Sequence, residues 1–174
     1  ETEPRVRGRI ASPGRSADGT IRLRWWARQG LELGANPAPE GGAGARLFSD
    51  MAPLSFQVKQ TAAHSAGALA AVQKGVFTPH IAPPPETFAE LKQTVAETLE
   101  GVGRYKPADI NALEGRDMRF EFRDRVLPFT VENFLMSFSM PNFYFHAATA
   151  YDIFRHNGVP LGKRDFMGNL RLKQ

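Results

Sequence analysis

The chain contains no cysteine, which excludes disulfide bridges, thiolate catalysis and zinc sites built on cysteine. No hydrophobic run approaches the roughly 20 residues needed to cross a bilayer, so we expect no membrane partner. Residues 41–44 (GGAG) are not followed by the lysine and hydroxyl residue of a phosphate-binding loop. A Gly-x-Ser-x-Gly nucleophile motif is also missing. The chain therefore carries neither of these sequence signatures of nucleotide-binding proteins and hydrolases. We expect a cytoplasmic protein.

A concentrated charge of one sign is missing as well. The chain has 22 basic and 18 acidic residues, a net charge of +4 and a pI near 9.7. Residues 1–45 contribute seven arginines against five acids, and the remainder contributes fifteen basic against thirteen acidic residues. Because each part carries only +2, neither has the basic stripe that phosphate backbones require, and we expect no nucleic-acid partner.

The N-terminal quarter of the chain shows no sustained hydrophobic period. Eight of the 16 glycines precede residue 46, and residues 36–44 have the composition of a flexible connector. The exception is a short alternating stretch at 21–26 that ends in Trp25 and Trp26. We therefore expect residues 1–44 to be irregular and partly disordered, and residues 45–174 to form one folded domain.

Helical signals become clear after residue 49. Ser49 or Asp50 is expected to cap a helix that Gly75 ends. This helix has an apolar stripe with helical spacing: Leu54, Val58, Thr61, Ser65, Leu69 and Val72. Four prolines between 76 and 85 exclude a helix there.

A second helix is expected to open with a capping box at Thr87–Glu90 and to continue along an apolar seam. Gly101 and Gly103 are expected to stop it. Residues 118–122 alternate apolar and charged and predict a β-hairpin with residues 126–129, in which Pro128 confines its strand to an edge. Thr130 is expected to cap a helix that reaches about residue 140.

Residues 141–158 (PNFYFHAATAYDIFRHNG) carry the strongest single signal. The segment starts with a proline and ends with Asn-Gly, the preferred residues at the two ends of a helix. It either continues the preceding helix with a kink or begins a new one. Asn142 and His146 fall on one face of it. A polar pair on an aromatic helix fits a lined pocket, and it also fits a core helix with one hydrogen-bonded histidine.

This segment, with the tail at 159–168 (VPLGKRDFMG), closely resembles the C-terminal signature of the family called domain of unknown function nineteen-ninety-three (DUF1993), within the DinB-like helical-bundle superfamily. Residues 45–54 (ARLFSDMAPL), continuing to His64, and residues 87–91 resemble two further blocks. The resemblance implies a mainly α, antiparallel DinB-like four-helix bundle with a small β-hairpin. Its first helix is expected to be atypical or replaced, because no amphipathic helix precedes Ala45.

The resemblance also implies the place of a site. DinB-like bundles commonly hold a divalent metal with three histidines, one on the second helix and two spaced i, i+4 on the last. His64 and His146 match two of these positions, but the third is Ala150, which has no donor atom. Asn142 is a poor ligand for zinc or nickel, and His156 lies roughly 15 Å farther along a helix. We expect no cofactor, with a divalent metal at His64 and His146 as the alternative.

Six residues are expected around a cavity between the second and last helices: Asp50, Gln57, His64, Asn142, His146 and Tyr151. The two histidines are expected to be neighbours, and an acid such as Asp50 beside His146 would make it a general base. Two functions follow. One is a small-molecule-binding bundle with a degenerate metal site, and the other is a non-enzymatic bundle that associates with itself as a homodimer. The sequence leaves open the ligand and whether any reaction is catalysed.

Overall fold

The computed structural model describes residues 41–167, and three long helical rods dominate it. The second rod is the single helix α4 (Phe88–Gly103). The first rod contains α2 (Leu54–Ala62), a π-helical segment η2 (Ala63–Gly67) and α3 (Ala68–Lys74). The third rod contains α6 (Val131–Asn133), a π-helical segment η3 (Phe134–Ser139) and α7 (Met140–His156). The shorter elements are η1 (Gly42–Gly44), α5 (Pro107–Asn111), α8 (Lys163–Met167), β1 (Val76–Phe77), β2 (Asp117–Phe122) and β3 (Arg125–Thr130).

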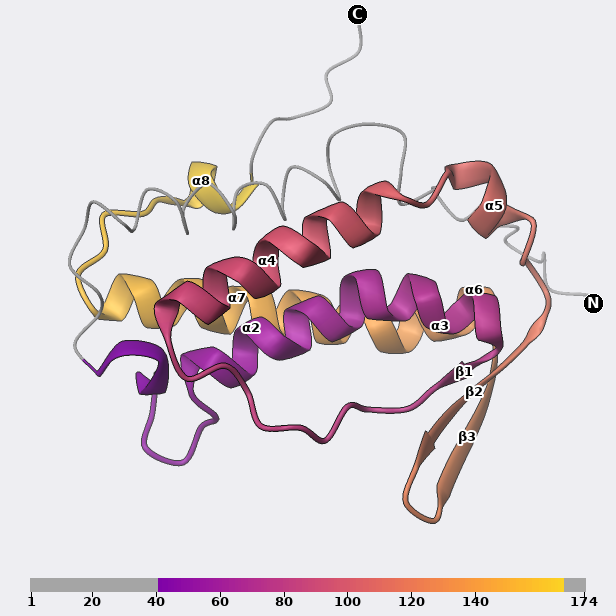
Figure 1. Cartoon of the computed structure of the whole chain (residues 1–174), viewed down its shortest axis with the longest axis horizontal. Helices are drawn as coiled ribbons and strands as arrows, with labels where there is room; N and C mark the ends of the chain where they lie inside the picture. Colours follow the sequence, from indigo (N-terminus) through magenta and orange to yellow (C-terminus); the bar gives the residue numbers. More distant parts are fainter. Residues whose placement is uncertain (1–40, 168–174) are drawn as a thin grey trace, which may run out of the picture.

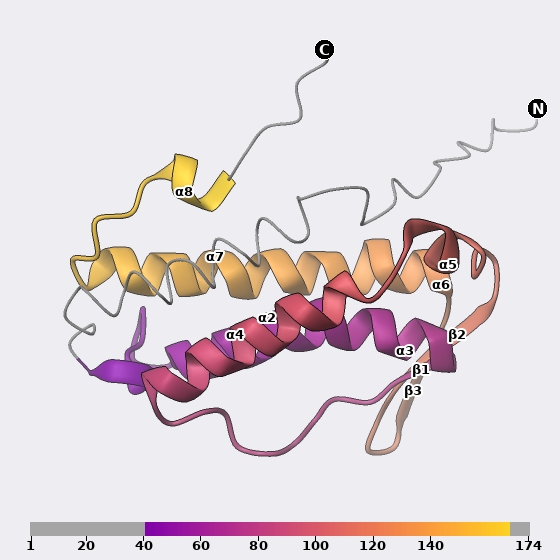
Figure 2. The same cartoon turned by 45° about the horizontal axis from the view of Figure 1, so that its top comes forward.

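The three rods lie side by side along the length of the molecule (Figures 1 and 2). The first and second rods run in the same direction because residues 78–87 return along the bundle before α4 begins, and the third rod runs opposite to both. The Lys59 ammonium donates to the carbonyl of Ala82 and ties this returning segment to α2. The sheet lies at the end of the bundle where α3 ends and α6 begins, and α8 lies toward the other end. The predicted mainly α bundle with a hairpin is confirmed.

The start of the first rod differs from the prediction. Ser49 and Asp50 lie in an exposed turn, and α2 begins at Leu54 with Pro53 as a cap that has no side-chain bond. Pro53 is extended, with φ −69° and ψ 169°, and a proline disfavours helical geometry in the residue before it. The helix therefore starts after the proline. Gly75 ends the rod as predicted, with a left-handed φ of 74°.

The second rod confirms one prediction and corrects another. Thr87 and Glu90 form the expected capping box. The helix ends at Gly103, as predicted, but it passes through Gly101 without a break. A Cβ atom at Gly101 would lie 3.1 Å from the Cβ of Ala66 in η2. Gly101 is therefore a point of close approach between two rods rather than a terminator.

The predicted hairpin is present as β2 and β3, with Pro128 on the edge strand of a sheet of order β1-β2-β3. Strand β1 was not predicted, because two residues carry no measurable periodicity. It pairs parallel to β2, with Val76 opposite Arg119, directly after the turn at Gly75.

The third rod is continuous from Val131 to His156, so Pro141 continues a helix rather than starting one. Segment η3 ends at Ser139, two residues before this proline. A proline has no N–H to donate, and its ring collides with the carbonyl four residues earlier. A wider π turn just before Pro141 relieves that collision. Neither this π segment nor η2 was predicted.

The core is divided into two apolar clusters. One contains the start of α2, the first half of α4 and most of α7, and the other contains α3, the sheet and the start of the third rod. Between the two clusters each rod buries polar side chains: Thr61 on the first, Thr98 on the second and Ser139 on the third. A polar layer therefore crosses the middle of the bundle.

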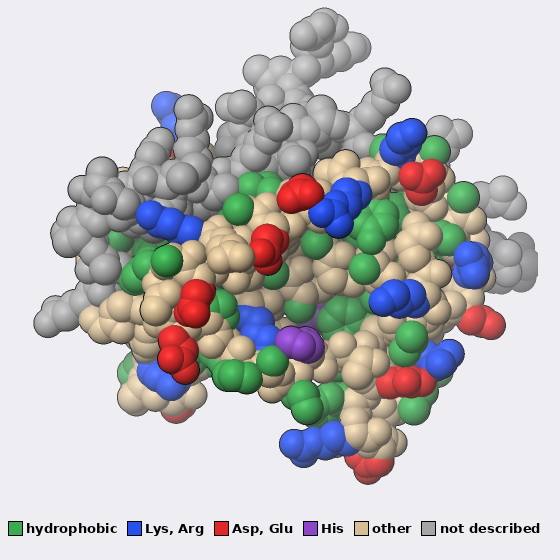
Figure 3. All heavy atoms as spheres, in the orientation of Figure 1, with side chains coloured by type: hydrophobic (Ala, Val, Ile, Leu, Met, Phe, Trp, Pro, Cys, Tyr) green, Lys and Arg blue, Asp and Glu red, His purple; other side chains and the backbone are tan. Residues whose placement is uncertain are grey.

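The surface and the chain ends complete the description. Acidic and basic side chains are mixed over the face shown in Figure 3. Within residues 41–167, no helix combines the length and apolar character that a membrane span requires. The predictions for residues 1–40, including the alternating stretch before Trp26 and the replaced first helix, lie outside the described residues. Ala43, just before the predicted domain start, is buried in the core.

Candidate functional site

His146 of α7 lies against Gln57 of α2. Gln57 is 2% exposed, and its Oε1 lies 2.8 Å from Nδ1 of His146. The amide nitrogen of Gln57 donates to the carbonyl of Ala52 at 2.9 Å, which fixes which end of the amide faces the histidine. Because an amide oxygen only accepts, Nδ1 of His146 carries the proton and donates it. The lone pair of this imidazole is therefore on Nε2.

His64 lies at the same level of the bundle, where the two π-helical segments meet. It is the second residue of η2, and Ser139 is the last residue of η3. The Ser139 hydroxyl donates to the backbone carbonyl of His64 at 3.1 Å, and its Oγ lies 3.4 Å from Nδ1 of the imidazole. These contacts join residues that are 75 positions apart in the sequence.

The two imidazole rings are neighbours, as the sequence led us to expect. Their centroids are 6.2 Å apart and their planes differ by 11°. Aromatic side chains surround both rings. Phe77 stacks on His64 at 5.3 Å, Phe138 meets it edge-on at 5.7 Å, and Phe145 meets His146 edge-on at 5.3 Å.

Both imidazoles are held neutral by this environment. The pKa of His64 is lowered to about 4, mainly by burial and to a smaller extent by the neighbouring His146. Burial also lowers the pKa of His146 below the ordinary 6.5. Two neutral imidazoles therefore face an aromatic environment at neutral pH, where each offers one N–H donor and one lone pair.

Three further residues were predicted for this site: Asp50, Asn142 and Tyr151. Asp50 lies in the exposed turn before α2, and the position beside His146 that we assigned to an acid is taken by the neutral Gln57. Asn142 donates to the carbonyl of Phe138 in its own helix at 2.7 Å. Tyr151 packs edge-on against Phe166 of α8 at 5.6 Å.

The donor set does not fit a three-histidine metal site. Ala150, at the third position of the expected triad, is fully buried and has no donor atom. Among residues 41–167, no three side chains of His, Asp or Glu gather closely enough to hold a metal ion.

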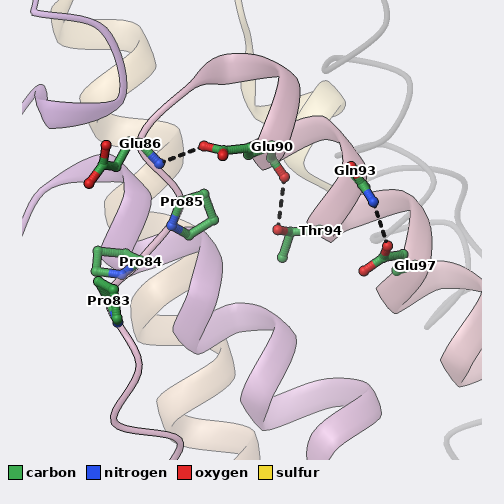
Figure 4. Close-up of a pocket in the computed structure, with 8 residues that line it drawn as sticks. All are labelled: Pro83, Pro84, Pro85, Glu86, Glu90, Gln93, Thr94 and Glu97. Atoms are coloured by element: carbon green, nitrogen blue, oxygen red, sulfur yellow. Dashed lines mark hydrogen bonds between the residues drawn. The ribbon is translucent and has the colours of Figure 1, made fainter.

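A surface hollow of about 450 Å³ lies elsewhere, between the returning segment and the start of α4 (Figure 4). Its lining combines prolines with acidic and amide side chains: Pro83, Pro84, Pro85, Glu86, Glu90, Gln93, Thr94 and Glu97. Glu90 accepts hydrogen bonds from the backbone amides of Glu86 and Thr87, and Gln93 donates to Glu97. These side chains are engaged in capping and pairing α4, so we assign this hollow a structural role.

Sequence reasoning missed Ser139, Phe77 and Phe138 as neighbours of the histidines. Ser139 lies in a Ser-Phe-Ser run that carries no recognisable motif. Phe77 lies in a strand of two residues. The π-helical segments that orient Ser139 and His64 have no reliable sequence signature, so these contacts become visible only in the folded chain.

The chain is similar to known proteins in sequence and in fold. A family model described as Domain of unknown function (DUF1993) matches residues 32–167. The fold is similar to that of a DinB family member protein from Shewanella denitrificans, with a TM-score of 0.67, 24% sequence identity and 90% of each chain covered. No curated protein matches the chain.

Proposed function

The chain belongs to the domain of unknown function (DUF1993) family, and we propose that it is a DinB-like bundle that binds a small molecule at the His64–His146 pair. In this proposal the pair occupies the place where DinB-like bundles hold a metal, and Ala150 marks the loss of the third histidine. We place this binding in the cytoplasm, without a nucleic-acid or membrane partner, in keeping with the mixed charge and the lack of cysteine.

The observation that carries the proposal is the hydrogen-bond chain from His146 through Gln57 to Ala52. This chain is buried on the Gln57 side, and it holds the imidazole in one tautomer. A histidine fixed through Nδ1–H presents Nε2 as an acceptor in a defined direction. A core histidine whose N–H group already has an acceptor needs no further polar neighbour, but the imidazole of His64 is stacked beside that of His146.

The surroundings indicate the chemical class of the ligand. The phenylalanine rings around both histidines favour a ligand with a flat apolar body. The lone pair of a neutral imidazole favours a ligand with an O–H or N–H donor. The ligand expected here is therefore a small aromatic or otherwise apolar molecule that carries one or two hydrogen-bond donors. His146 is half-buried, so part of its side chain is open to solvent.

Phenol and anisole provide a direct test, because both have the same ring and only phenol has a donor. With ¹⁵N-labelled histidine, phenol is expected to shift the Nε2 resonance of His146 in a saturable manner. Anisole is expected to bind roughly 5–10-fold more weakly, the worth of one hydrogen bond. Equal titration curves for the two compounds, or no shift with either, would contradict the proposal.

A matched pair of variants locates the binding. H146F keeps an aromatic ring but removes Nε2, and it is expected to abolish the preference for phenol over anisole. H156F makes the same change at an exposed histidine near the end of α7 and is expected to keep that preference. Titration with zinc in the absence of phenol tests the metal alternative, and micromolar zinc binding that H146F removes would favour it.

Self-association is a second candidate, favoured by apolar side chains that the described surface leaves exposed. Phe145 on α7 is 58% exposed, and Phe48 before α2 is 67% exposed. If the surface around Phe145 joins two copies, F145K is expected to convert a dimer into a monomer in sedimentation velocity, while K163A leaves the dimer intact. A wild-type protein that sediments as a monomer at 100 μM, roughly the upper range for a specific weak dimer, would exclude this candidate.

A further inference from the structure

The two π-helical segments meet at His64 of η2, which contacts both Ser139 and Phe138 of η3. A π turn adds one residue to a helix and leaves a backbone carbonyl without its usual donor. In η2 the carbonyl of His64 receives the hydroxyl proton of Ser139 from the opposite rod. Ser139 is 1% exposed, so water does not compete for this bond.

A serine hydroxyl has a single proton to donate. Because that proton is directed to the carbonyl of His64, the Oγ atom faces Nδ1 of the same residue as an acceptor. Nδ1 then carries the ring proton, and the lone pair of His64 is on Nε2. Gln57 imposes the same tautomer on His146 by a different route.

From this we infer that Ser139 is a positioning residue of the binding site: it fixes His64 in the Nδ1–H tautomer, so that both histidines present Nε2 lone pairs to the ligand. The inference rests on the proposed function for its purpose, but the tautomer itself is a property of the free protein. On the side of the second rod, Gly101 of α4 approaches Ala66 of η2 closely.

The test is the tautomer of each histidine, read from long-range ¹H–¹⁵N correlation spectra of ¹⁵N-histidine-labelled protein at pH 7.5 without ligand. In the wild type, Nε2 of both His64 and His146 is expected to be the unprotonated, pyridine-type nitrogen. S139A is expected to move His64 toward the Nε2–H tautomer and to leave His146 unchanged. S137A, the same change at an exposed serine of η3, is expected to alter neither.

An isosteric pair covers the case in which S139A does not fold. S139T keeps the hydroxyl and S139V removes it at equal size, so only S139V is expected to change the tautomer of His64. A His64 tautomer that is the same with and without the hydroxyl would overturn the inference. This outcome is independent of whether phenol binds the wild type, so it is distinct from a failure of the proposed function. If both hold, S139V is expected to weaken phenol binding roughly 3–10-fold.

Discussion

Replacing Phe77 by alanine is expected to lower the free energy of unfolding by about 3–5 kcal/mol, the range for a large buried aromatic side chain. Phe77 is 6% exposed and lies at the centre of the aromatic cluster beside the site. Its ring centroid is 5.3 Å from that of His64 and 5.4 Å from that of Phe134. The neighbouring rings cannot move in to fill the space that the Phe77 ring would leave, because the strand that carries residue 77 is held in place by its pairing with β2.

The same substitution is expected to change the chemistry of the site. Burial is the main reason that the pKa of His64 is lowered to about 4, and Phe77 covers one face of this imidazole. Removing the ring admits water to that face, so the pKa of His64 is expected to rise toward its ordinary value of 6.5. Urea denaturation measures the first effect, and histidine NMR titration measures the second.

Phe145 offers the matched control, since its ring also contacts a histidine of the pair but is 58% exposed. F145A is expected to change the free energy of unfolding by less than about 0.5 kcal/mol. If F77A leaves the pKa of His64 at about 4, the aromatic cluster is not the source of its depression.

The parts of the fold that could be predicted are those with a local chemical cause. A capping box needs a hydroxyl and a carboxylate three residues apart, and Thr87 and Glu90 form one as expected. Gly75 ends its helix because its left-handed φ is accessible to glycine. Gly101 shows the limit of this reasoning. The same residue type that ends one helix serves in another to let a second rod approach, and only tertiary packing distinguishes the two roles.

The candidate site could be predicted only in part, for a related reason. The resemblance to DinB-like bundles, which places the second and last helices side by side, was sufficient to bring His64 and His146 together, with Gln57 two turns before His64. Ser139 was missed because its role depends on two π turns that shift the register of two separate rods. The role of these residues in ligand binding stays a prediction.

Acidification from pH 7 to pH 5 is expected to destabilise the protein through the histidine pair. The pKa of His64 is about 4 in the folded chain and near 6.5 when unfolded. Between these values the unfolded chain binds more protons, so stability rises with pH and is lost as the pH falls. His64 alone is expected to contribute roughly 1–2 kcal/mol to the loss at pH 5. The pKa of His146 is also lowered by burial, so it acts in the same direction.

The protonation of carboxylates sets the lowest pH at which the stability of the protein reports on the histidines alone. Hydrogen bonds from the amides of Thr87 and Glu86 lower the pKa of Glu90, so that its protonation destabilises the fold only at more acidic pH. Urea unfolding curves between pH 7 and pH 5 therefore report mainly on histidines. H64F is the decisive variant, because it keeps a ring in the aromatic cluster and keeps the backbone carbonyl that Ser139 bonds, but it cannot titrate.

The stability of H64F is expected to depend less steeply on pH than that of the wild type, with His146 supplying the remaining slope. H80Q, a change at an exposed histidine in the returning segment, is expected to retain the wild-type slope. A wild-type profile that is flat from pH 7 to pH 5 would show that His64 is not held neutral by its surroundings. A lone pair on Nε2 would then be lost to protonation over this range, and with it the acceptor on which small-molecule binding by this pair depends.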